Sequence, residues 1–229
     1  EHLWLTWSRN DRHNGKTPQI RELKAMREQG TTAQGLKNFS IPMVQIAQLP
    51  YKDVPVDAYL LGLLLGDGCC HRDAGITIGT ADKEIAEYCQ HAVLENMRVV
   101  ITDIKNGFVL IGLRKIAGKR NPLKTHLESL GVLGKRSWEK FIPELYLWNS
   151  AEIRLAILQG LMDTDGCAHV NPRSTSVFFS TTSLQLGKDV QFLVQSLGGT
   201  ACLTPGYMGP KNIHQHYRVA ISLPSMLSP

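Results

Sequence analysis

The sequence lacks the features of a zinc-binding, disulfide-rich or membrane-spanning protein. Its five cysteines are an odd number, and none belongs to a C-x-x-C pair of the kind found at zinc or redox sites. We therefore expect reduced thiols in a cytosol-like compartment. The longest apolar run, Ala58 to Leu65, is too short to cross a bilayer, and the first residues lack the basic-then-apolar pattern of a secretion signal.

Charge is moderately abundant and unevenly distributed. Charged residues make up 20% of the 229 residues and hydrophobic residues 43%, which excludes disorder of the whole chain. The net charge of +5 favours an anionic partner but is common among proteins without one. Between Arg98 and Lys140, ten basic residues stand against three acidic ones, a local excess of seven. This stretch is either a solvated basic face or a phosphate-binding surface.

The first fifty residues read differently from the rest. A polar, basic stretch runs from Ser8 to Lys16, a helical-looking piece covers Gln19 to Gln29, and glycine and threonine cluster around residues 30–35. We expect residues 1–50 to form a small separate element or a linker.

The remainder contains an internal repeat. The segment L-L-G-L-L-L-G-D-G-C-C-H, Leu60 to His71, matches L-Q-G-L-M-D-T-D-G-C-A-H, Leu158 to His169, at an offset of 98 residues. The runs that follow, I-T-I-G-T-A-D and V-F-F-S-T-T-S, match at an offset of 101, as a three-residue insertion in a hairpin would produce. The two copies are predicted to occupy residues 51–149 and 150–229.

Each copy reads as helix, two strands, helix, two strands. The two nearly all-apolar helices, capped by Asp57 and Ser150, are predicted to be buried. A last helix is predicted only in the first copy, at Pro122 to Leu130, and the second copy reaches Pro229 before any such helix. The fold class is therefore α+β, a pseudo-twofold pair of repeats with a curved antiparallel saddle of strands.

The contact between the copies is predicted at two glycines. Gly62 and Gly160 allow the two apolar helices to approach closely, so that Asp67 and Asp165 emerge side by side. Two adjacent carboxylates repel unless a cation or a proton lies between them. A hard divalent ion such as Mg²⁺ suits such a pair facing a phosphodiester. In the alternative, each Asp-Gly is only a turn that ends a helix, which explains one copy more easily than two.

The paired signature resembles that of the LAGLIDADG homing endonucleases, from about Tyr51 to the end of the chain. The resemblance assigns metal binding to Asp67 and Asp165 and places the preceding residues, Gly66 and Thr164, in the same site. The motif's earlier acidic position is Asp163 in the second copy but Leu65 in the first, a position that is not a metal ligand of the family.

Two lysines are candidates for the chemistry. The run K-F-I-P, Lys140 to Pro143, is similar to the setting of an active-site lysine in endonucleases embedded in inteins. Lys140 would polarise the attacking water or stabilise phosphorane charge, or it is only one more cation in a basic stretch. For the second half, Lys211 is the nearest candidate.

The resemblance implies an enzyme that acts alone on duplex DNA. It would use Mg²⁺ or Mn²⁺ to make a double-strand break with short overhangs in a long asymmetric site. It would be a monomer without an obligate protein partner or membrane association, located in the cytoplasm with nucleoid or phage DNA. The alternatives are an RNA-splicing maturase and a DNA-binding relic whose catalysis has decayed.

Polar residues on the strand-like runs are candidates for contacts with DNA, although exposed polar residues on a sheet's wet face are equally ordinary. The candidates are His71, Arg72, Thr77, Lys105, Arg114, Lys119, Arg120, His169, Asn171 and Arg173. The repeated C-x-H pattern, Cys69 with His71 and Cys167 with His169, could also place zinc ligands on one strand face. Its spacing is too short for the usual zinc motifs, and duplication already explains the pairing.

The opening E-H-L-W-L-T-W resembles part of the histidine-containing block of intein splicing domains, with His2 as the histidine. No nucleophilic Cys or Ser begins the sequence and no His-Asn ends it. We therefore do not expect this chain to splice itself.

Overall fold

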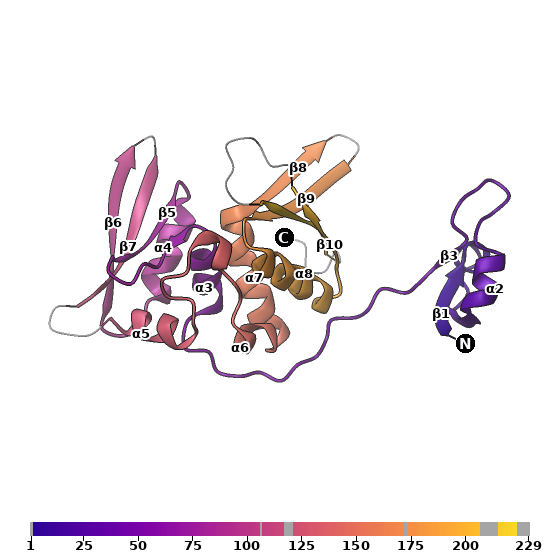
Figure 1. Cartoon of the computed structure of the whole chain (residues 1–229), viewed down its shortest axis with the longest axis horizontal. Coiled ribbons are helices and arrows are strands. Elements are labelled where there is room, and N and C mark those ends of the chain that lie inside the picture. The colour runs from indigo at the N-terminus through magenta and orange to yellow at the C-terminus, as the bar shows by residue number, and fades with distance from the viewer. Residues whose placement is uncertain (1, 106, 117–120, 172–173, 207–214, 224–229) are drawn as a thin grey trace. The chain divides into compact units, whose positions relative to one another are not determined.

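The computed structural model describes residues 2–105, 107–116, 121–171, 174–206 and 215–223. The chain forms two compact units, residues 1–44 and 45–229 (Figure 1). The boundary lies before Gln45. Ala47 is already bonded to the second repeat, because its backbone N–H donates to the carbonyl of Ser196 at 2.9 Å.

The first unit is a small three-stranded sheet with two short helices. Its elements are β1 (Leu3–Ser8), α1 (Arg9–His13), β2 (Gln19–Glu22), α2 (Leu23–Glu28) and β3 (Phe39–Ser40), with the strand order β2-β1-β3. The helix predicted from Gln19 is wrong over its first turn. Residues 19–22 pair antiparallel with β1 instead, and the helix begins only at Leu23.

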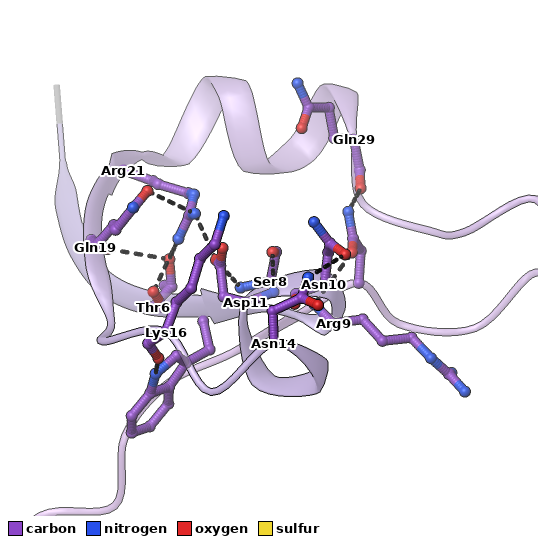
Figure 2. A network of polar contacts seen from close by, with 12 residues as sticks. Thr6, Ser8, Arg9, Asn10, Asp11, Asn14, Lys16, Gln19, Arg21 and Gln29 are labelled. Atoms are coloured by element: carbon purple, nitrogen blue, oxygen red, sulfur yellow. Dashed lines mark hydrogen bonds and ion pairs between the residues drawn. The ribbon is translucent and has the colours of Figure 1, made fainter.

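A network of polar contacts joins the elements of this unit (Figure 2). Ser8 caps α1, because its hydroxyl accepts from the backbone N–H of Asp11 at 3.1 Å. The Asp11 carboxylate accepts from the backbone of Ser8 at 2.8 Å and forms an ion pair with Arg21 at 2.6 Å. Arg21 also donates to the carbonyl of the buried Thr6 at 2.8 Å. Polar bonds therefore supply much of the cross-linking in this unit.

The second unit contains the two predicted repeats. The first comprises α3 (Ala58–Leu65), β4 (Gly68–Cys69), β5 (Ile76–Thr80), α4 (Lys83–Ala92), β6 (Met97–Lys105), β7 (Phe108–Lys115) and α5 (Pro122–Ser129). The second comprises α7 (Ala151–Asp165), β8 (Gly166–Asn171), β9 (Ser174–Thr181), α8 (Leu184–Ser196), β10 (Thr200–Pro205) and β11 (Tyr217–Ser222). A 3₁₀ turn, Ser137–Glu139, and α6 (Glu144–Leu147) lie between them.

The two sheets have the same topology. Their strand orders are β4-β5-β7-β6 and β10-β11-β9-β8, all antiparallel, so the equivalent strands occupy equivalent places. This confirms the predicted α+β fold of duplicated helix-strand-strand-helix-strand-strand units. The end of the second copy, where no further helix is predicted, falls on residues 224–229, outside the described residues.

The apolar helices α3 and α7 pack against each other between the two sheets (Figure 1). A Cβ placed on Gly62 would lie 2.5 Å from the carbonyl oxygen of Ile157, and one on Gly160 would lie 2.3 Å from that of Tyr59. Only glycine fits this crossing, as predicted. Asp57 caps α3 by accepting from the backbone of Leu60 at 2.8 Å.

Ser150 is the N-cap residue of α7, as predicted, but its side chain makes no capping bond. The side chain of Asn149 holds the start of α7, because its oxygen accepts from the backbone of Ser150 at 2.8 Å. The same oxygen accepts from the backbone of Lys52 at 3.0 Å, and the Asn149 amide donates to the carbonyl of Lys52 at 2.9 Å. Asn149 thereby fixes the segment before α3 to the start of α7.

Burial explains why the repeat helices are so apolar. Seven of the eight residues of α3 are buried, and the buried core continues through the inner faces of both sheets, with Ile78 and Phe179 at equivalent positions. Among the described residues, no helix is long and apolar enough to cross a membrane. The five cysteines are free thiols.

Candidate functional site

The ends of α3 and α7 open into one hollow. Asp67 lies two residues beyond α3, Asp165 is the last residue of α7, and both line a cavity of about 340 Å³ together with Lys140. The remaining lining residues are Leu65, Gly66, Ser137, Ser180, Thr181, Thr182 and His216. The structure thus brings together two carboxylates and a lysine that are separated by 25 to 98 residues in the sequence.

Close packing explains the residues that surround the aspartates. A Cβ on Gly66 would overlap the hydroxyl of Thr164, and a Cβ on Gly68 would lie 2.4 Å from the carbonyl oxygen of Leu64. Gly166 is constrained in the same way, at 2.2 Å from the carbonyl oxygen of Met162. The glycine after each aspartate is therefore required by the chain that folds back over the helix end. These contacts account for the glycines of both Asp-Gly turns, and the metal-binding role of the two aspartates stays a prediction.

The two carboxylates influence each other. Burial, followed by the negative charge of Asp67, raises the pKa of Asp165 to about 6, while Lys140 acts in the opposite direction. In the protein alone, Asp165 therefore holds its proton to a higher pH than an exposed aspartate. A cation between the two carboxylates would relieve this cost.

Lys140 is half-buried at the edge of the hollow. Its ammonium donates to the carbonyl oxygen of Gly66 at 2.6 Å and lies 3.4 Å from that of Gly68. It therefore contacts the backbone on both sides of Asp67. Burial lowers the pKa of Lys140, whereas Cys70 and the two aspartates act in the opposite direction. A partly desolvated ammonium next to the carboxylates is suited to stabilising charge that develops on a phosphate.

The K-F-I-P segment is positioned by the second repeat. Ser183, which caps α8, donates its hydroxyl proton to the carbonyl of Lys140 at 2.6 Å. The backbone N–H of Ile142 donates to the buried carboxylate of Asp189 at 2.8 Å. The sequence analysis missed Ser183 and Asp189. A carboxylate on the apolar face of L-Q-L-G-K-D-V-Q-F-L-V is the signal that could have identified Asp189.

The donor set fits a hard ion better than zinc. The described residues contain no group of three His, Cys, Asp or Glu side chains that could hold a metal. Mg²⁺ and Mn²⁺ accept two carboxylates with backbone oxygens, water and phosphate, whereas structural zinc needs four protein ligands, usually thiolate or imidazole. Asp67 and Asp165 fit such a hard ion. The C-x-H pairs do not assemble a zinc site in the described part of the chain.

The outer face of the first sheet carries exposed cations. Strand pairing places Thr77 opposite Gly112, on the face away from the buried Ile76 and Ile78. The exposed Arg114 lies on that same face, and its guanidinium group lies over Gly75 and Gly112.

Arg98 is directly opposite Arg114 in β6 and is also exposed, which makes it a candidate that the sequence analysis did not single out. Only the register of β6 against β7 reveals that the two arginines are neighbours.

The outer face of the second sheet is similar. His169 and Asn171 are exposed on β8 and share the face of Phe178. Arg218 on β11 lies over the Phe178 ring, with its guanidinium carbon 4.4 Å from the ring centroid. Arg218 pairs with Ser180, which lines the hollow, so this face leads to the aspartates. Arg218 was missed because it follows a polar stretch with no pattern of its own.

Other predicted contact residues lie elsewhere. Arg72 is exposed but packs on Gly134 and forms a long ion pair of 3.6 Å with Glu128 at the end of α5. His71 is exposed in the turn after β4 and accepts from the backbone of Asp73 at 3.3 Å. Lys105 ends β6, and nothing is described of its side chain. Lys119, Arg120, Arg173 and Lys211 lie outside the described residues.

Comparison with known proteins identifies the second repeat directly. Residues 152–222 match the LAGLIDADG-like domain family. In the fold, the chain is similar to a structure from a study of mesophilic variants of the homing endonuclease I-DmoI, with a TM-score of 0.50 and 14% identity. That similarity covers 74% of this chain and 89% of the other. At this identity it supports the fold alone.

The curated relatives include a replicative DNA helicase, a RecA protein and a DNA gyrase polypeptide. The chain is 34% identical over 173 residues to the replicative DNA helicase DnaB of Rhodothermus marinus, which covers 71% of this chain and 18% of that protein. It is 28% identical over 154 residues to protein RecA of Mycobacterium tuberculosis, covering 63% and 19%. It is 44% identical over 72 residues to a DNA gyrase polypeptide of Mycobacterium gordonae, covering 30% and 13%. The chain spans a fifth or less of the length of these relatives.

Proposed function

The chain carries a LAGLIDADG-like domain, and from this premise we propose that it is an endonuclease that cuts both strands of duplex DNA with Mg²⁺ or Mn²⁺. The observation that carries the proposal is the convergence of Asp67, Asp165 and Lys140 in one hollow. A hollow that needed only to bind DNA would gain nothing from two adjacent carboxylates, because they repel phosphate.

The residues of the chain divide the work. Asp67 and Asp165, with the backbone oxygens of Gly66 and Thr164 beside them, would hold the divalent ion. The ion would supply Lewis acidity to the scissile phosphate and lower the pKa of the attacking water. Lys140 would stabilise the negative charge that grows on the phosphate during attack, from its fixed position against the carbonyl of Gly66.

DNA would lie against the outer faces of the two sheets. Arg98, Arg114 and Arg218 would neutralise phosphates, while Thr77, His169 and Asn171 would face base edges. These groups differ between the two repeats, so the preferred target would be asymmetric. Because one chain supplies both halves of the α3–α7 contact, a monomer would be sufficient.

An origin within inteins is supported by the relatives. The helicase DnaB, protein RecA and the DNA gyrase polypeptide are different proteins, yet each shares with this chain only a minor part of its length. A mobile element inserted into unrelated hosts accounts for that pattern. The intein-like opening of the sequence, E-H-L-W-L-T-W, agrees with it.

The test is to replace Asp67 or Asp165 by Asn. The amide keeps the size of the side chain but loses the charge that holds the ion. We expect double-strand cleavage to be abolished in Mg²⁺, while binding to DNA in Ca²⁺ is largely retained. Since a metal could be shared, residual nicking by a single variant is compatible with the proposal.

Asp163→Asn is the matched control. This aspartate lies two residues from Asp165, but its carboxylate accepts from the hydroxyl of Tyr59 at 2.6 Å and does not line the hollow. It should leave cleavage intact. The target is first selected by sequencing the cleavage products of a library of randomised duplexes. Full cutting by the double variant of Asp67 and Asp165 would refute the site.

Two other outcomes would replace the proposal. A DNA-binding relic would show no Mg²⁺-dependent cutting even in the unmodified protein. A maturase would bind a structured intron more tightly than any duplex.

A further inference from the structure

An apolar groove of about 920 Å³ runs beside α7, and neither Asp67 nor Asp165 lines it. We call it the α7 groove and define it by Met162, Ala168, Val177, Ile221 and Leu223, with Gln159 and Asp163 along its rim. The four larger apolar residues of this set are only partly buried. An open apolar surface of this size usually marks a place where another element packs.

The duplication identifies what packs at the equivalent place in the first repeat. There, Leu61, Leu64, Leu65, Gly68 and Cys70 line a residual space of only about 10 Å³, together with Leu127 of α5 and Val132 just beyond it. The equivalents of those first five residues, at an offset of 98, are Gln159, Met162, Asp163, Gly166 and Ala168. All five line the α7 groove.

Exposure follows the same division. Leu61 and Leu64 are 0% and 2% exposed, whereas Gln159 is exposed and Met162 half-buried. On the sheets, Leu113 at the end of β7 is fully buried, while its equivalent on β11, Ile221, is half-buried. The groove is therefore the surface that α5 covers in the first repeat, and among the described residues nothing covers it in the second.

We propose that the α7 groove binds an amphipathic helix presented at the end of β11, as α5 is presented after β7. The chain leaving β11 is already at the groove, because Leu223 directly follows the strand and lines it. The first repeat shows the required pattern, since Leu123 and Leu127 of α5 are both buried and lie four residues apart.

The rim differs between the repeats. Where the first repeat has Leu61 and Leu65, the second has Gln159 and Asp163, so a basic or amide side chain on that side of the docking helix would strengthen the contact. Such a side chain is not required for docking, because the Asp163 carboxylate already accepts from the Tyr59 hydroxyl at 2.6 Å. The proposal does not depend on the endonuclease chemistry.

The test joins a helix of known behaviour to the full chain. A copy of residues 116–134, which contains α5, replaces residues 224–229 after Leu223. The matched control carries the same copy with both of its leucines that correspond to Leu123 and Leu127 changed to Asp. The reporter is Ala168→Cys, placed where the first repeat has Cys70, in a background in which Cys69, Cys167 and Cys202, the exposed thiols, are changed to Ser.

Docking should bury the thiol introduced at position 168. We expect the joined helix to slow its reaction with an aromatic disulfide reagent about tenfold, as local opening then becomes necessary. We also expect the melting temperature to rise by about 5 °C. Unchanged reactivity and melting, or equal protection by the Asp-bearing copy, would overturn the proposal. If the chain without an added helix lost reactivity as its concentration rose, a second copy would be the occupant, and the proposal would be wrong.

Discussion

The crossing of α3 and α7 offers a test of the whole arrangement through one methyl group. In Gly160→Ala, the new Cβ would lie 2.3 Å from the carbonyl oxygen of Tyr59 and 2.9 Å from the backbone nitrogen of Leu63. Ordinary contacts begin at 3.4 Å, so the methyl group is short of room by about 1 Å on a side that is entirely backbone. No side chain can rotate away to make space.

The sign of the change in stability is informative, because replacing glycine by alanine normally stabilises a helix by about 1 kcal/mol. Overpacking of a well-packed core typically costs about 1 to 3 kcal/mol, and a backbone contact places Gly160→Ala at the upper end, at about 3 kcal/mol. For a chain of this size, that loss lowers the melting temperature by about 10 °C. Because the helices must separate, Asp67 and Asp165 would move apart, and cleavage should fall more than binding.

The assay is thermal unfolding followed by circular dichroism, with cleavage measured below the transition. Gly79→Ala is the matched control for stability, because a Cβ there would meet no atom within 4 Å. It should leave the melting temperature nearly unchanged. If Gly160→Ala had the same melting temperature as the unmodified protein, the close helix crossing would not exist in solution. The geometry of the hollow would then have to be revised.

Three further predictions concern charge and assembly. Burial and Asp67 raise the pKa of Asp165 from 3.8 to about 6, so between these values the folded protein keeps a proton that the unfolded chain loses. Without divalent ions, the free energy of unfolding should therefore fall as pH rises from 4 to 6. Denaturant titrations should show this dependence, and it should disappear in Asp165→Asn. A free energy of unfolding that did not change with pH in the unmodified protein would contradict the interaction between the two carboxylates. Changing both Arg98 and Arg114 to Gln should reduce the salt dependence of DNA affinity by about two units of logarithmic slope, whereas Lys24 and Arg27 changed to Gln in α2 should leave it unaltered. Equal slopes in all proteins would remove the sheet face from the DNA interface. Light scattering should show one chain, free and on one target site, because the α3–α7 contact is internal; a stable dimer on that site would oppose this.

Much of the architecture is determined locally by the sequence. The repeated apolar helices, the alternating strand runs and the Asp-Gly turns give the order of elements, because each reflects a period or a capping preference that acts over a few residues. The two glycines, Gly62 and Gly160, predict the helix contact correctly. The duplication adds information that a single copy lacks. Because the pattern occurs twice, it predicts which two helices pack together and which two aspartates lie next to each other.

Only the tertiary structure decides how distant groups combine. The sequence does not show that Ser183 and Asp189 hold the segment of Lys140, because those bonds span more than forty residues. Nor does it place Arg98 beside Arg114, which depends on the register of two strands. The first turn of the helix predicted from Gln19 was wrong because pairing with β1 outweighs local helix preference. The exposure of the α7 groove is likewise a property of packing, since equivalent sequence positions are covered in one repeat and open in the other.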